Sequence, residues 1–104
     1  MDFGQRRQEL HEIFCNILGS RECHFQPPAT IELRYPTIIY ELSTSDIRYA
    51  DNSLYKHRWC YSVTAITRDP ETDIPEKIAE LPLCRANRFY QADNLNHYNF
   101  TLYY

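Results

Sequence analysis

Residues 58–67 show the clearest alternation of side-chain character in the sequence. One set of alternate positions is entirely apolar and consists of Trp59, Tyr61, Val63 and Ala65. The other set is mixed and consists of Cys60, Ser62, Thr64 and Ile66. Because successive side chains of a strand point to opposite faces, this period of two predicts a half-buried β-strand.

Two segments have the period of an amphipathic helix. In residues 5–18, apolar side chains recur at helical spacing at Leu10, Ile13, Phe14, Ile17 and Leu18. Gly19 follows, at a position where a left-handed residue often ends a helix. In residues 73–82, the apolar stripe consists of Ile74, Ile78 and Leu81. Asp73 and Glu76 have the spacing of a capping box for this second helix.

Further strands are predicted on both sides of the second helix. The extended segments cover residues 22–25, 35–42, 85–92 and 97–104. Asp93 and Asn94 supply the turn between the last two. Pro27 and Pro28 predict a stiff exposed loop at 26–30, because proline fixes φ and lacks the N–H donor.

The order of these elements predicts the fold class. The strand at 35–42 is expected to pair with the strand at 58–67 as a hairpin, whose long polar connection forms an arm around 43–56. The order is α-β-β-β-α-β-β, which predicts an α+β fold with a mostly antiparallel sheet and two helices packed on one face.

Composition and charge describe one ordinary globular domain over residues 1–104. The chain is 43% hydrophobic and 24% charged, and its net charge of −3 argues against a general nucleic-acid binder. With only two glycines, it has no glycine-rich phosphate loop. Its nine tyrosines are typical of strand faces and also of protein interfaces, and both interpretations stay open.

The four cysteines show no C-x-x-C spacing. The sequence also shows no signal-peptide pattern and no apolar run of membrane length. We therefore expect reduced, mostly buried thiols, with no disulfide framework, no metal site and no membrane partner.

No catalytic arrangement is predicted. The histidines are scattered, and no strand–turn–helix elbow presents a nucleophile beside a base. The acidic group Asp69, Glu71, Asp73 and Glu76 is better explained as a negative helix start facing the macrodipole than as a hydrolytic pair. We expect a protein that is not an enzyme and needs no cofactor.

Two binding interpretations remain. Basic residues interleaved with tyrosines suggest contact with RNA or phosphate, or else a strand edge guarded by charge, and comprise Arg34, Tyr35, Arg48, Tyr49, Tyr55, Lys56, His57 and Arg58. A protein–protein surface built from the Pro27-Pro28 loop, the arm and the tyrosine-rich strands fits the composition best.

A series of short segments, in order along nearly the whole chain, resembles a known family. The segments are Gln8–His11, Phe25–Pro28, Arg34–Pro36, Arg48–Asp51, Arg68–Pro70, Ile74–Lys77 and Ala92–His97. Together they resemble the small tail-completion proteins of long-tailed bacteriophages, the tail-terminator or head-tail joining class.

The resemblance implies a virion structural protein of the phage neck, assembled in the host cytoplasm. Such a protein forms a homo-oligomeric ring, typically a hexamer, that caps the tail tube and meets the head connector or stopper protein. DNA passes through the ring without specific binding, and no enzyme activity or cofactor is implied. The alternatives are another neck role, as stopper or adaptor, or a small monomeric protein- or nucleic-acid-binding module.

The expected subunit interface lies mainly in the arm. Its residues are Ile47, Arg48, Tyr49, Asp51, Leu54 and Tyr55, together with Pro27 and Pro28. A loop that only had to be soluble would not need so many large apolar side chains. We therefore expect Tyr49 and Tyr55 to anchor the arm on a neighbouring subunit, since aromatic residues often carry interface energy. The alternative is an arm folded back on its own sheet.

Overall fold

The computed structural model describes residues 3–43, 49–50 and 58–104. The elements, in chain order, are α1 (Phe3–Leu18), β1 (Cys23–Phe25), β2 (Thr37–Leu42), β3 (Tyr49–Ala50), β4 (Arg58–Thr67), α2 (Ile74–Ala79), β5 (Cys84–Ala92) and β6 (Leu95–Tyr103). The strands lie in the order β1-β2-β4-β6-β5, and β3 pairs with β4 beside this path.

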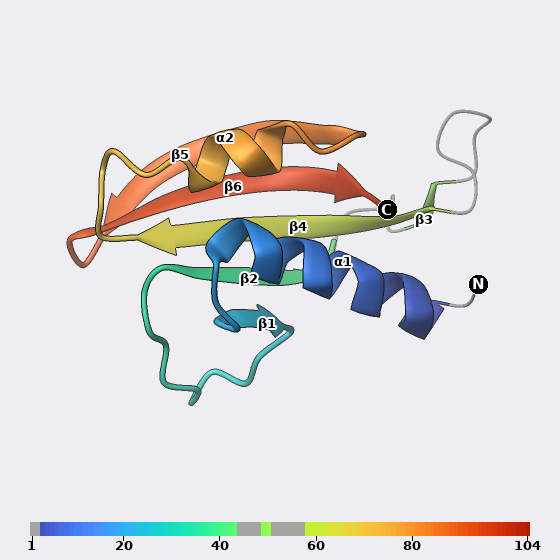
Figure 1. Cartoon of the computed structure of the whole chain (residues 1–104), viewed down its shortest axis with the longest axis horizontal. Helices are drawn as coiled ribbons and strands as arrows, with labels where there is room; N and C mark the ends of the chain where they lie inside the picture. The colour runs from blue at the N-terminus through green and yellow to red at the C-terminus, as the bar shows by residue number, and fades with distance from the viewer. Residues whose placement is uncertain (1–2, 44–48, 51–57) are drawn as a thin grey trace.

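The sheet is mostly antiparallel, and both helices cover the same face of it. Only β1 runs parallel to its neighbour β2, with Cys23 opposite Ile38. The other strand pairs are antiparallel. Figure 1 shows α1 crossing the β2–β4 side and α2 lying over β5 and β6. The α+β class and the packing of two helices on one face, both predicted from the sequence, are confirmed.

The core lies between the helices and this face. Val63, Phe100 and Leu102 from the central strands are at most 3% exposed, as are Phe14 of α1 and Ile78 of α2. The apolar face predicted for residues 58–67 points toward the helices, as the pairing of Tyr40 with Val63 on this side of the sheet indicates. Burying both apolar faces together removes them from water and sets the register of the strands.

Left-handed residues lie at two predicted boundaries. Gly19 has a φ of 74°, and its N–H donates to the Cys15 carbonyl over 2.9 Å, which ends α1 as expected. Asp93 and Asn94 have φ values of 54° and 62° and form the turn between β5 and β6. Positive φ at both central residues matches the right-handed twist of the strands that they join.

Several element bounds differ from the sequence prediction. Helix α2 is shorter than residues 73–82, and Asp73 makes no side-chain capping hydrogen bond, so the predicted capping box is wrong. The Ile74 N–H donates instead to Thr72 Oγ1 over 3.3 Å. The arm contributes a strand that was not predicted, β3, whose Tyr49 lies opposite Trp59.

Candidate interaction surface

The face of the sheet opposite the helices carries a network of amide and hydroxyl groups. The side-chain amide of Asn99 donates to Ser62 Oγ at 3.1 Å and to Thr64 Oγ1 at 2.9 Å. Asn87 donates in turn to Asn99 Oδ1 at 3.1 Å and to Thr101 Oγ1 at 2.6 Å. The amide and hydroxyl groups on this face therefore form hydrogen bonds with one another. A polar face of this kind is compatible with solvent or with a polar partner.

A stack of three side chains stands beside this network. The rings of Tyr90 and His97 lie nearly parallel, with centroids 4.6 Å apart. The guanidinium of Arg88 lies 4.6 Å from the centroid of the Tyr90 ring. This cation–π contact fixes Arg88 on the face of the sheet away from the helices.

Strand β5 is an open edge of the sheet. It pairs with β6 and with no other described strand. A bulge at Ala86/Arg88 places Asn87 and Arg88 together toward the uncovered face. Arg85 and Arg88 form no ion pair with the described carboxylates. The edge therefore has free backbone groups and unpaired positive charge.

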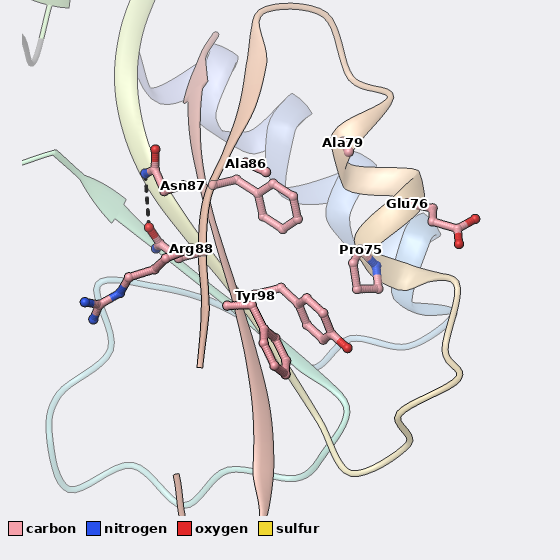
Figure 2. A pocket seen from close by; sticks show the side chains of 10 residues that line it. Pro75, Glu76, Ala79, Ala86, Asn87, Arg88 and Tyr98 are labelled. Carbon is pink, nitrogen blue, oxygen red and sulfur yellow. Dashed lines mark hydrogen bonds between the residues drawn. The ribbon is translucent and has the colours of Figure 1, made fainter. Parts of the chain in front are cut away.

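An apolar groove runs along the helix side of this edge. It has a volume of about 360 Å³ and is lined by Pro75, Ala79, Ala86, Phe89 and Tyr98, among others. Figure 2 shows Ala86 and Tyr98 on the side of α2 and Arg88 pointing away from it. The groove exists because two alanines face each other between α2 and β5. Phe89 is consequently 54% exposed, although its ring contacts Tyr98 with centroids 4.9 Å apart.

The other edge of the sheet is β1, and the loop that follows β1 lies there, far from β5 (Figure 1). Pro27 is half-buried and Pro28 is exposed, and both line a hollow of about 390 Å³ with Ile31 and Arg7. Residues 31–34 have no regular secondary structure. This loop is the one part of the predicted interface whose side chains lie within the described residues.

A second polar hollow surrounds His11 on α1. The buried Tyr40 hydroxyl lies 2.8 Å from His11 Nδ1 and accepts from Arg7 over 3.0 Å. Burial, with the positive charges of Arg7 and Arg21, lowers the pKa of His11. Burial raises the pKa of Tyr40 to about 12. Both shifts favour an uncharged His11 beside an un-ionised Tyr40, an arrangement in which an unprotonated Nδ1 accepts the hydrogen bond from the Tyr40 hydroxyl. The contact joins α1 to β2.

Most of the predicted interface lies outside the described residues. Ile47, Arg48, Asp51, Leu54 and Tyr55 belong to the segments 44–48 and 51–57, which the structure does not describe. The backbone of Tyr49 lies in β3. The role of Tyr49 and Tyr55 as anchors on a neighbouring subunit stays a prediction.

The predicted basic cluster does not form one surface. Arg34 precedes β2, whose first residue Thr37 lies opposite Ile66 near the end of β4. Arg58 begins β4 at its other end. A strand rises about 3.3 Å per residue, so nearly the whole length of β4 separates the two arginines. Tyr35 contacts Arg68 instead, with the guanidinium carbon of Arg68 5.3 Å from the centroid of the Tyr35 ring. Arg48, Lys56 and His57 lie outside the described residues.

The other chemically suggestive groups make local contacts. Asp69 accepts the N–H of Glu71 over 2.9 Å, and Asp73 pairs with Lys77 over 3.3 Å. Three of the four cysteines, Cys15, Cys23 and Cys60, are buried, which agrees with the expectation of mostly buried thiols. In the described part of the chain, no group of three or more His, Cys, Asp or Glu residues could hold a metal ion. Nor does any described helix have the length and hydropathy needed to cross a membrane.

Comparison with protein-family models, with curated proteins and with solved structures found no match.

The β5 edge and its groove were not predicted. The segment 85–92 was recognised as a strand, but its position at the edge depends on the pairing of distant strands. The one signal in the sequence is Phe89, a large apolar residue between Arg88 and Tyr90. That signal would also fit a buried position, so it does not identify an exposed site.

Proposed function

We propose that this chain is a non-enzymatic structural subunit that assembles with copies of itself into a ring, in the manner of phage tail-completion proteins. One observation carries the proposal: the sheet ends in two different edge strands, β1 at one end of the strand order and β5 at the other. Contacts between two different surfaces of identical subunits are heterologous, and they close into rings when the rotation between subunits allows.

Further support comes from the resemblance, whose segments follow the same order along nearly the whole chain. The α+β architecture also agrees with the fold that the resemblance implies. In this proposal, the ring is a hexamer at the head–tail junction. It contacts the tail tube protein on one side and the head connector or stopper protein on the other, and it lets DNA pass without specific binding.

The test is the mass and shape of the purified protein. Multi-angle light scattering over a range of concentrations should give an oligomer of fixed stoichiometry, and negative-stain electron microscopy should show closed rings. Purified tails of a phage that encodes this chain should also contain it. A protein that stays monomeric at every concentration and never enters particles contradicts the proposal.

A nucleic-acid-binding module is the alternative, and no geometric observation favours it over assembly. Its basic residues are separated along the sheet where they are described. Binding to nucleic acid that weakens steeply with added salt would nevertheless support it against the ring.

A further inference from the structure

Two surfaces of the chain, on opposite sides of the sheet, complement each other. The first is the β5 edge, where Arg88 and Glu76 also line the apolar groove. The side chain of Arg88 points away from α2, to the side of the sheet that also carries Arg85 (Figure 2). The second is the segment Ile31–Arg34 in the loop after β1 (Figure 1). Because they lie on opposite sides of one subunit, they can meet only between two subunits.

The last three residues of the segment Ile31–Arg34 have backbone groups available for pairing, whereas the Ile31 N–H donates to the Pro28 carbonyl at 3.1 Å. Within the described chain, Glu32, Leu33 and Arg34 make no backbone–backbone hydrogen bond. Ile31 and Leu33 alternate with the exposed Glu32 and Arg34. This is the pattern of a strand with one apolar side and one charged side.

The edge of β5 offers the matching features. A strand added along it would place alternate side chains over the groove and over the uncovered face. On the groove side, Phe89 is 54% exposed and the volume is about 360 Å³. A cavity of about 150 Å³ holds benzene, so this groove has room for Ile31 and Leu33.

Charge favours one of the two ways in which the added strand could face the sheet. With Ile31 and Leu33 over the groove, Glu32 faces the side that carries Arg85 and Arg88. Neither arginine is paired with a described carboxylate, and strands β5 and β6 contain none. Arg34 lies on the same side as Glu32, so the complementarity depends on Glu32.

We infer that the segment Ile31–Arg34 of one subunit adds as a strand to the β5 edge of a second copy of this chain. Ile31 and Leu33 enter the groove beside Phe89, and Glu32 pairs with Arg88. The contact is heterologous, because it joins two different surfaces of identical subunits. A row of such subunits has one free segment Ile31–Arg34 at one end and one free β5 edge at the other, and a ring closes when these two meet. This inference rests on the proposed function, because it names the surfaces that meet in the assembly.

A charge swap tests the contact. Glu32→Arg and Arg88→Glu should each weaken self-association about tenfold or more, measured by sedimentation velocity, because each places like charges together. The double variant restores the opposite pair and should recover most of the loss. Glu71→Arg changes an exposed carboxylate on neither surface, so it is the matched control and should assemble as the wild type does.

The groove has a separate test. Ala79→Leu fills the groove from α2 and should also weaken assembly, while circular dichroism stays that of the wild type. A protein that forms rings unaffected by Glu32→Arg, Arg88→Glu and Ala79→Leu overturns the inference and leaves the proposed function standing.

A peptide separates the inference from the proposed function. A fluorescein-labelled peptide of residues 29–36 should bind the Glu32→Arg variant, whose own segment no longer competes, and should not bind Arg88→Glu. This readout stands even if the intact chain is monomeric, a result that would contradict the ring. A peptide that binds neither variant overturns the inference.

Discussion

At the scale of the residue, the contact among Arg7, His11 and Tyr40 links the charge of one histidine to the packing of α1. Tyr40 is fully buried, and its hydroxyl can donate to His11 only while the ring nitrogen is unprotonated. A charged His11 would also lie beside the guanidinium of Arg7. Both effects favour the neutral histidine in the folded state.

This state of His11 predicts a pH dependence of stability. The pKa of His11 is lowered on folding, so near the ordinary value of 6.5 the unfolded chain binds a proton more readily than the folded chain. The stabilisation is complete above 6.5 and is lost as the pH falls through the lower folded pKa. Urea denaturation at pH 7.5 and 5.5 gives the free energy of unfolding at each pH. Between these two values it should fall less for His11→Gln than for the wild type. Equal losses would contradict this, since the other histidines are common to both proteins.

At the scale of the element, the β5–β6 hairpin is defined by its turn. Ala92 lies opposite Leu95, so Asp93 and Asn94 form a two-residue loop in which both φ values are positive. This requirement explains why β6 begins at Leu95, earlier than the alternation of side chains predicted. Asparagine tolerates the left-handed region better than most residues, and glycine tolerates it best.

Asn94→Gly should therefore stabilise the protein. We expect a gain of about 0.5 kcal/mol in the free energy of unfolding, because glycine avoids the steric cost that other residues meet in the left-handed region and an aspartate–glycine pair suits this turn. Asn94→Val is the opposite control, since a β-branched side chain is strained at positive φ, and it should lower the midpoint of thermal unfolding. An unchanged midpoint for both variants would show that the turn does not limit stability.

At the scale of the whole molecule, the arm and the edges of the sheet determine how subunits could meet. Two parts of the arm are described: Ser43, whose N–H donates to the Cys60 carbonyl at 2.9 Å, and β3, which pairs with β4. This pairing is compatible with an arm that packs on its own sheet and with one that also reaches a neighbour.

The double variant Tyr49→Ala with Tyr55→Ala distinguishes these cases. If the two rings anchor the arm on a neighbouring subunit, the monomer should fold normally by circular dichroism but fail to form rings by light scattering. Loss of the folded signal would place the rings in the core of the monomer. Normal assembly would place the interface elsewhere.

The sequence by itself determined most elements of this protein and which of their faces are buried. The strand over residues 58–67 was predicted with correct bounds, and its apolar face is the one that packs against the helices. Cys60 and Ile66 of the other face are buried as well, which the alternation did not predict. The end of α1 at Gly19 and the turn at Asp93-Asn94 were also correct, because positive φ restricts the choice of residue. The helix start at Asp73 was wrong, because the side chain of Thr72 takes the hydrogen bond instead.

Only the tertiary structure decided which strands are neighbours, and with them the candidate site. The parallel pairing of β1 with β2, the place of β5 at the edge and the facing of Ala79 and Ala86 each join distant parts of the chain. Local periodicity records which side of an element is apolar, whereas a groove or a free edge depends on what the rest of the fold leaves uncovered. Residues 31–34 and the β5 edge could meet only between two subunits, because the sheet holds them on opposite sides of one subunit (Figure 1).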